Sequence, residues 1–235
     1  MRIDVLTLFP GMFDAVFGES IIRRAIGSKK VSINLHNIRD YTKDKHKKVD
    51  DKPFGGGPGM ILGPQPVFDA VESVKKKNRN ATVILMSPQG KLFAQAMAHR
   101  LSGRKGIIII SGHYEGIDER IRDIVDEEIS IGNYILTGGE LPAMVVIDTI
   151  VRLIPGVLGD SESSKYESFP FGLLEYPQYT RPAIYNKMKV PDILLSGNHR
   201  LINLWRRKKS ILRTINKRPD LINNIRQLEI KDTTR

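Results

Sequence analysis

The sequence of 235 residues contains no cysteine. A disulfide scaffold, a zinc site built on thiolates and catalysis by a cysteine nucleophile are therefore excluded. Its five histidines show no spacing typical of a metal site, so we expect no metal ligands. Long apolar runs are also missing, because the longest, 107–110 and 143–147, fall far short of the roughly 20 residues that span a bilayer. The N-terminus carries no signal-peptide pattern, so we expect a cytoplasmic protein with no membrane partner.

Acidic residues are few relative to basic ones. The chain has 37 Lys and Arg against 26 Asp and Glu, a net charge of +11, and this excess favours a polyanionic partner such as nucleic acid. Residues 171–235 hold 14 of the basic and only 5 of the acidic residues. A stretch rich in Ser and acidic residues, 159–165, lies near this change and has no apolar period, which is typical of a linker. We therefore expect domains at 1–158 and 171–235, joined by a flexible linker at 159–170.

Short apolar runs in the first part predict strands, and amphipathic stretches between them predict helices. The expected strands are 3–9, 31–35, 82–86, 107–111 and 127–131, and the expected helices are 66–74, 92–101, 117–125 and 139–153. Alternating strands and helices indicate an α/β fold with a mostly parallel sheet. In the tail, apolar residues at helical spacing predict a helix over 200–217, and thus a small helical domain.

Three glycine-containing segments follow predicted strands: 87–90, 112–116 and 132–142. Ligands of α/β sheets bind at the carboxyl ends of the strands, where glycine lets the backbone approach a flat ligand closely. The segments together favour a nucleotide-like cofactor, although an ordinary turn explains any one of them equally well. No Walker loop is present, because the glycines at 55–59 precede no Lys-Ser or Lys-Thr, and no G-x-G-x-x-G follows a strand.

Several long, ordered segments resemble one family along the whole chain. They are 49–60 (VDDKPFGGGPGM), 87–90 (SPQG), 112–120 (GHYEGIDER), 130–144 (SIGNYILTGGELPAM), 152–159 (RLIPGVLG), 176–182 (YPQYTRP) and 194–199 (LLSGNH). With them the chain resembles the bacterial tRNA (guanine-N1)-methyltransferases. The resemblance implies a parallel sheet with a deep trefoil knot (SPOUT-like), a homodimer, and methyl transfer from S-adenosylmethionine to N1 of the guanosine immediately 3′ of the anticodon, tRNA position 37. It also implies help from a divalent ion such as Mg²⁺, for which no carboxylate cluster marks a site.

The family's cofactor segments can be carried over residue by residue. The resemblance implies that the following residues bind the cofactor: Leu85, Met86, Ser87, Pro88, Gln89, Gly112, Tyr114, Glu115, Gly116, Ile131, Gly132, Asn133, Tyr134, Ile135, Leu136, Gly138, Gly139 and Pro142. The Glu115 carboxylate would suit the positive sulfonium. From the residues alone, Glu115 is equally a solvated loop acid, and Tyr114 and Tyr134 are equally half-buried tyrosines that close their loops.

Methylation of guanine N1 needs a base for its proton and a cation or donor near O6. In the family these are an aspartate in the linker and an arginine before the I-P-G-V-L-G segment, on different subunits. The resemblance places the arginine at Arg152 and the acid at Glu167, where this chain has glutamate instead of aspartate. From the sequence alone, Arg152 is a cation near a helix C-terminus.

The basic tail suits a structured RNA, whose phosphates attract Lys and Arg. The expected RNA contacts are Lys187, Lys189, Arg206, Arg207, Lys208, Lys209, Arg213, Lys217 and Arg218. Other interpretations stay open: an RNA-binding protein that has lost catalysis, a knotted methyltransferase for ribosomal RNA or a ribose hydroxyl, and an enzyme for a small nucleotide. The last leaves the basic tail unexplained.

Overall fold

The structure, a computed structural model, describes residues 1–159, 167–169 and 172–222. Its contacts divide the chain into two compact units, Met1–Asp160 and Ser161–Arg235. Most of the expected linker, 159–170, lies outside the described residues, so its flexibility stays a prediction.

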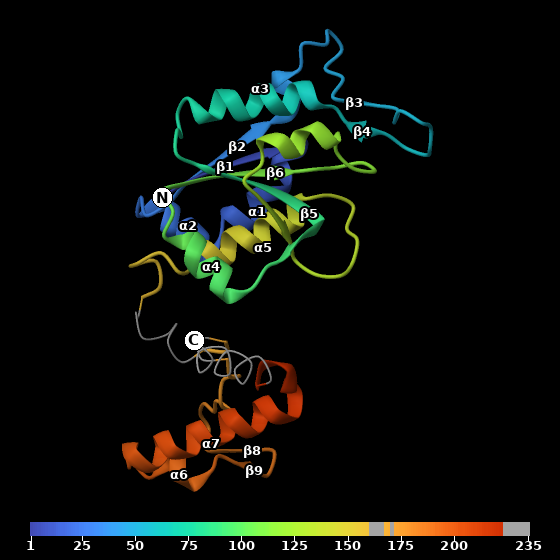
Figure 1. Cartoon of the computed structure of the whole chain (residues 1–235). Coiled ribbons are helices and arrows are strands. Elements are labelled where there is room, and N and C mark those ends of the chain that lie inside the picture. Colours follow the sequence, from blue (N-terminus) through green and yellow to red (C-terminus); the bar gives the residue numbers. More distant parts are fainter. Residues whose placement is uncertain (160–166, 170–171, 223–235) are drawn as a thin grey trace, which may run out of the picture. The chain divides into compact units, whose positions relative to one another are not determined.

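The first unit is built on a parallel sheet of five strands (Figure 1). The order across the sheet is β2-β1-β6-β5-β7, and each neighbouring pair is parallel. The strands are β1 (Arg2–Thr7), β2 (Ser32–Asn37), β5 (Thr82–Leu92), β6 (Gly106–Ser111) and β7 (Glu127–Ser130). The parallel sheet expected from the alternation of strands and helices is therefore confirmed.

Helices cover both faces of this sheet (Figure 1). One face packs against η1 (Pro10–Phe13), α1 (Asp14–Phe17), α2 (Ser20–Gly27), α4 (Gln95–Ser102) and α5 (Glu140–Val151). The other packs against η2 (Ile38–Tyr41), α3 (Pro64–Lys75), η3 (Glu119–Ile124) and the hairpin of β3 (Asp50–Asp51) and β4 (Ile61–Leu62). Strand β6 supplies both cores, with Ile107 and Ile109 in the first and Ile108 and Ile110 in the second.

Several element boundaries differ from the predicted ones for local reasons. The strand expected over 3–9 ends at Thr7, whose hydroxyl accepts a hydrogen bond from the Phe9 amide (2.9 Å), and Pro10 then begins η1. The helix expected over 117–125 is the 3₁₀ helix η3, which the Asp118 side chain caps by accepting from the Arg120 amide (3.0 Å). The short helices α1 and α2 were not predicted.

The second unit is organised around α7 (His199–Lys217), which confirms the helix expected over 200–217. An extended segment runs along it: the Leu174 amide donates to the Thr214 hydroxyl (2.8 Å), and the Ser210 hydroxyl donates to the Leu174 carbonyl (2.5 Å). The antiparallel hairpin of β8 (Ile184–Tyr185) and β9 (Met188–Lys189) and the short α6 (Asp192–Leu195) complete the unit. The hairpin was not predicted.

Candidate active site

The carboxyl ends of β5, β6 and β7 and the start of α5 surround a cavity of about 260 Å³. Every residue expected to bind the cofactor lines it except Asn133. The cavity is also lined by six residues that are not among those expected to bind the cofactor, of which His113 and Thr137 lie within the expected segments: His113, Ile117, Arg122, Ile129, Ser130 and Thr137. The fold therefore brings the three glycine-containing segments together, and their role in binding a cofactor stays a prediction.

The first segment is not the turn after a strand that the sequence predicts. Met86 and Lys91 both pair with Ile129 of β7, so residues 87–90 form a bulge inside β5. Gly90 permits this close pairing, because a Cβ there would lie 2.4 Å from the carbonyl carbon of Glu128. Strand pairing on both sides of the bulge thus holds Ser87, Pro88 and Gln89 at the cavity wall.

The third segment lies directly against the end of β6. The Gly139 amide donates to the Gly112 carbonyl (2.7 Å), and a Cβ on Gly139 would lie 2.8 Å from the Ser111 Cα. A Cβ on Gly138 would meet His113 Nδ1 at 2.5 Å. Gly139 is therefore required for the backbone of this segment to reach the second one, whereas a side chain at position 138 would displace those of Glu140 and His113.

The second segment is fastened to the loop between β3 and β4. The Glu115 amide donates to the Met60 carbonyl (3.1 Å), and the Glu115 side chain lies over Gly59, where a Cβ would be 2.2 Å from its Cγ. Tyr114 has a left-handed backbone (φ 65°), and its hydroxyl accepts from Arg39 (3.1 Å). The glycine-rich stretch thus gives Glu115 its place beside the cavity.

The two tyrosines behave differently. Tyr114 is half-buried, whereas Tyr134 is 55% exposed and donates from its hydroxyl to the carbonyl of Ile131 (3.3 Å) in its own loop. Tyr134 thus closes its own loop, whereas Tyr114 is joined to Arg39 of η2, and both residues line the cavity.

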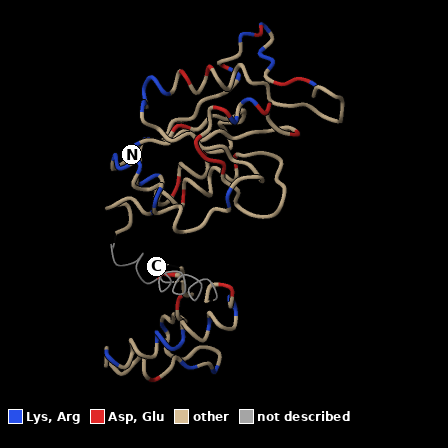
Figure 2. Tube along the Cα trace, in the orientation of Figure 1, with Lys and Arg blue, Asp and Glu red and all other residues tan. Residues whose placement is uncertain are grey.

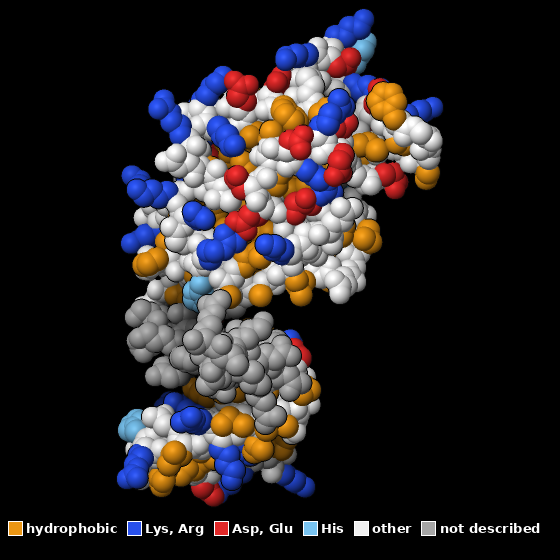
Figure 3. Space-filling model, viewed as in Figure 1, with side chains coloured by type: hydrophobic (Ala, Val, Ile, Leu, Met, Phe, Trp, Pro, Cys, Tyr) orange, Lys and Arg blue, Asp and Glu red, His pale blue; other side chains and the backbone are white. Residues whose placement is uncertain are grey.

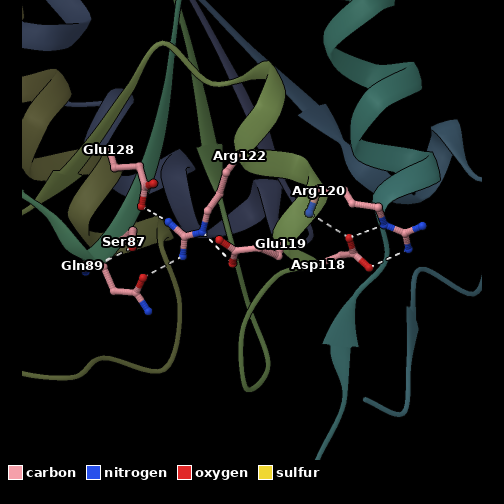
Figure 4. Close-up of polar contacts among 7 residues, drawn as sticks. All are labelled: Ser87, Gln89, Asp118, Glu119, Arg120, Arg122 and Glu128. Carbon is pink, nitrogen blue, oxygen red and sulfur yellow. Dashed lines mark hydrogen bonds and ion pairs between the residues drawn. The ribbon is translucent and has the colours of Figure 1, made fainter. Parts of the chain in front are cut away.

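Arg122 lies at the edge of the cavity and joins three elements (Figure 4). From η3 its guanidinium donates to Glu119 (2.9 Å), to the Gln89 side chain of the bulge (3.1 Å) and to Glu128 of β7. The hydrogen bond with Glu128 raises the pKa of Arg122, so the side chain is a permanent cation. The sequence signal for it is only an arginine between two glutamates, which is common on surfaces.

A buried carboxylate lies next to His113, one of the residues that line the cavity. Glu140, in the first turn of α5, is 1% exposed and accepts a hydrogen bond from the Thr7 hydroxyl (2.8 Å). Its other oxygen lies 3.5 Å from Nδ1 of His113, which is too long for a good hydrogen bond. The His113 ring packs against Phe9, with 4.6 Å between the ring centroids. Glu140 therefore ties the start of α5 to β1, and the helix dipole favours its charge there.

The two expected catalytic residues belong to different units. Arg152 is the C-cap of α5, where its amide donates to the Asp148 carbonyl (3.1 Å), so it does lie at a helix C-terminus. Glu167 precedes Ser168, whose hydroxyl accepts from the Glu175 amide (3.0 Å) in the second unit. Both side chains are partly buried. Their catalytic roles stay predictions.

The basic residues of the second unit divide into two groups. Arg206 and Arg213 hold the extended segment, the first over the Tyr176 ring and the second by donating to the Glu175 carbonyl (3.0 Å). The other residues expected to contact RNA are exposed: Lys187, Lys189, Arg207, Lys208, Lys209, Lys217 and Arg218. Figure 2 shows that basic residues dominate this unit, whereas Figure 3 shows acidic and basic side chains interspersed on the visible face of the first unit.

Among the described residues, no group of three or more His, Asp or Glu is placed to hold a metal ion. In the same part of the chain, no helix is long and apolar enough to cross a membrane.

Comparison with known proteins gives one consistent result. Residues 1–224 match the family described as tRNA (Guanine-1)-methyltransferase TrmD. Proteins named tRNA (guanine-N(1)-)-methyltransferase are similar over almost their whole length. The protein from Ruminiclostridium cellulolyticum is 59% identical over 96% of this chain and 97% of its own. Those from Caldanaerobacter subterraneus and Dictyoglomus turgidum are 58% and 54% identical over 94% of this chain, covering 92% and 90% of their own.

Proposed function

The chain belongs to the tRNA (guanine-1)-methyltransferase family and is an enzyme that methylates N1 of guanine in tRNA, and we propose that its target is guanosine 37, immediately 3′ of the anticodon. The observation that carries the proposal is the match over residues 1–224, which covers the first unit and most of the second. A target in the anticodon loop agrees with the chemistry, because a base must leave its stack before its edge can be methylated, and a loop base does so at low cost.

Family membership implies S-adenosylmethionine as the methyl donor, and the cavity fits it. The three segments around the cavity offer backbone N–H and C=O groups, and Gly138 and Gly139 keep its wall flat where a Cβ would collide with neighbouring atoms. The Glu115 carboxylate at the wall favours a cation. When bound, the cofactor supplies a methyl group on a positively charged sulfur. The chain therefore has to orient the guanine and remove its proton.

Glu167 and Arg152 are the proposed catalytic pair. The Glu167 carboxylate accepts the proton from N1, and the negative charge this leaves is shared between N1 and O6, where the Arg152 guanidinium stabilises it by donating a hydrogen bond. The N1 electron pair would then form the bond to the methyl carbon as the bond from that carbon to sulfur breaks, with its electron pair remaining on the sulfur. Glutamate is one methylene longer than the family's aspartate, and a displacement near 1 Å can cost on the order of 100-fold in rate, so this chain must place its carboxylate differently.

We also propose that the enzyme is a homodimer, as the family resemblance implies. Exposed apolar side chains support the proposal: Met12 and Val16 lie one turn apart on η1 and α1, and Leu141 and Val145 one turn apart on α5, which packs against η1. Such a surface is typical of a protein interface. Leu141→Asp with Val145→Asp should give a monomer in sedimentation experiments, and a dimer that persists in this variant would contradict the proposed interface.

Three finer features of the family are also proposed. A trefoil knot is consistent with the Gly139 segment passing against the loop after β6, which is itself fastened to β4 through the Leu62 amide and the Gly116 carbonyl (3.0 Å). Help from Mg²⁺ stays a prediction, to be tested by the effect of a chelator on the rate. A cytoplasmic location also stays a prediction.

The test is transfer of labelled methyl from S-adenosylmethionine to two transcripts of one tRNA, with guanosine or adenosine at position 37. Methylation of the guanosine transcript alone supports the proposal. Equal methylation of both would place the target elsewhere. Binding of cofactor and tRNA without methylation of either transcript would favour an RNA-binding protein that has lost catalysis.

A further inference from the structure

The second unit contains a cavity of its own. It has a volume of about 420 Å³ and lies between residues 176–183, α6 and α7. Its size falls within the range of small-ligand sites, roughly 300–1,000 Å³. The lining combines aromatic and cationic side chains: Tyr176, Tyr179, Arg181 and Arg206. This cavity is separate from the cofactor cavity, which is lined only by residues of the first unit.

Arg206 carries an unused donor inside this unit. Its guanidinium lies over the Tyr176 ring, 4.8 Å from the centroid. Its Nε is inaccessible to solvent and has no hydrogen-bond partner among the described residues. A buried donor that stays unpaired costs stability, so such a group in a native protein calls for an acceptor. Arg206 lines the cavity, so a ligand that turns its guanidinium toward the cavity can supply this acceptor.

The aromatic side chains indicate which ligand this is. Tyr179, which lines the cavity, is 50% exposed, and its ring centroid lies 6.5 Å from that of Trp205, which is outside the lining. Lys209 Nζ lies 5.8 Å from the centroid of the Trp205 ring. Exposed aromatic rings next to Lys and Arg are how proteins hold single-stranded nucleic acid, because bases stack on the rings while the cations meet phosphates. The excess of basic residues in 171–235 attracts such a polyanion.

We propose that the cavity of the second unit binds one unstacked nucleobase of the tRNA, with an oxygen of that nucleotide accepting from Arg206. The inference rests on the proposed function only in taking tRNA as the RNA. The second unit then recognises one nucleotide of the tRNA, in addition to attracting its phosphates through the basic surface.

The first test compares two arginines that are neighbours on α7. Arg206→Gln and Arg207→Gln remove the same charge, but only Arg206 lines the cavity, and Arg207 is exposed. With the full chain and an unmodified tRNA transcript, we expect Arg206→Gln to weaken binding about tenfold, the scale of one stacked base, and Arg207→Gln to weaken it about twofold. Equal losses would show that Arg206 acts only by its charge and would overturn the proposal.

The second test identifies the base. Each unpaired nucleotide of the transcript is replaced in turn by an abasic one, and binding is measured for the wild type and for Ala183→Trp. Ala183 is an exposed residue of the cavity rim, so the larger side chain narrows the cavity with little risk to the fold. We expect one abasic position to weaken wild-type binding about tenfold and to have no further effect in Ala183→Trp. If no position is coupled in this way, the cavity does not hold a base.

Both tests measure binding, so their result does not depend on catalysis. A failure of the proposed function would appear as absent methyl transfer by the wild type. A failure of this inference would appear as unchanged binding in the Arg206 and Ala183 variants of an enzyme that still methylates guanosine 37.

Discussion

The interactions that stabilise the first unit of this chain differ from those that stabilise the second. In the first unit, β6 is buried from Gly106 to Ser111 between two layers of helices. In the second, only Ile202 and Thr214 are buried among the described residues, and polar contacts join the extended segment to α7. Charge is distributed in the opposite way, with most of the basic excess in the second unit. A unit with a large buried core suits a small cofactor that must be held at fixed atoms, and a unit of mostly exposed, basic residues suits a large polyanion.

The proposed catalytic pair crosses this division, because Arg152 belongs to the first unit and Glu167 to the second. We expect Arg152→Gln and Glu167→Gln each to lower the single-turnover rate of methyl transfer by about 100-fold or more, the usual contribution of a positioned acid or base. The affinities for cofactor and tRNA should change little. Glu167→Asp keeps a carboxylate but shortens the side chain by one methylene, so its rate should lie between those of the wild type and Glu167→Gln.

The matched control for the base is Glu175→Gln, a carboxylate of the same unit with no catalytic role proposed. Near-normal single-turnover methylation by Glu167→Gln would show that another group removes the N1 proton.

Truncating a buried side chain should destabilise the first unit more than the second. Ile109 is fully buried in the sheet, and Ile109→Ala should lower the free energy of unfolding by about 2–5 kcal/mol. Ile202 is 7% exposed in a much smaller core, so the cavity left by Ile202→Ala is partly open to water and the loss should lie near the lower end of that range. Denaturant unfolding of both variants checks this order, and a larger loss for Ile202→Ala would contradict it.

A buried ion cluster makes the stability of the first unit depend on pH. Asp4 is fully buried on β1, and its oxygens accept from Arg2 (2.8 Å), His36 (2.9 Å) and Asn78 (3.0 Å). Burial alone would raise the pKa of Asp4, but these hydrogen bonds outweigh it and lower the pKa to about 2. An aspartate in the unfolded chain has a pKa of about 3.9, so Asp4 contributes roughly 2 kcal/mol of stability above pH 4, and this is lost as the pH falls toward 2.

The corresponding variant is Asp4→Asn. It should be less stable than the wild type by about 2 kcal/mol at pH 7, and the difference should shrink as the pH falls from 4 to 2. Asp220→Asn is the control from the second unit, because Asp220 pairs with Arg218 at the surface and should contribute almost nothing. A difference between wild type and Asp4→Asn that does not vary between pH 2 and 7 would exclude this role for Asp4.

Removing basic residues from the second unit should change the salt dependence of tRNA binding without changing the stability of the protein. Replacing Arg207, Lys208 and Lys209 by Gln should make the logarithm of tRNA affinity depend less steeply on the logarithm of salt concentration, by about 2 in slope, if each contacts a phosphate. The unfolding free energy should stay within about 0.5 kcal/mol. The control replaces Lys75, Lys76 and Lys77 of the first unit by Gln, and an equal change of slope there would show that the basic tail has no special role.

The sequence predicts the sheet well, and the reason is visible in the strands. Runs such as 107–110 are apolar on both faces, which only a strand between two layers of helices satisfies. The short α1 and α2 are missed because few residues carry their pattern. The bulge at 87–90 is missed because its cause, the close approach of Glu128 to Gly90, is a contact between strands far apart in the sequence.

The candidate site is predicted only in part for a similar reason. The glycine-containing segments are recognisable in the sequence, since close backbone approach requires glycine. Arg122 is not, because its place at the cavity depends on the position of η3. His113 lies within the recognisable segment 112–116, but its packing against Phe9 cannot be predicted from spacing. Nothing in composition or spacing marks Glu167 as a base, and that prediction comes from the family resemblance alone.

The most direct test of the division between the units is the affinity for S-adenosylmethionine, measured by calorimetry on three full-length proteins. These are the wild type, Gly139→Ala, and the triple variant of Arg207, Lys208 and Lys209. A Cβ on residue 139 would lie 2.8 Å from the Ser111 Cα, so we expect Gly139→Ala to displace the cavity wall and to lose cofactor affinity, while the triple variant binds like the wild type. Wild-type affinity in Gly139→Ala, or a loss confined to the triple variant, would contradict the assignment of the cofactor to the cavity of the first unit.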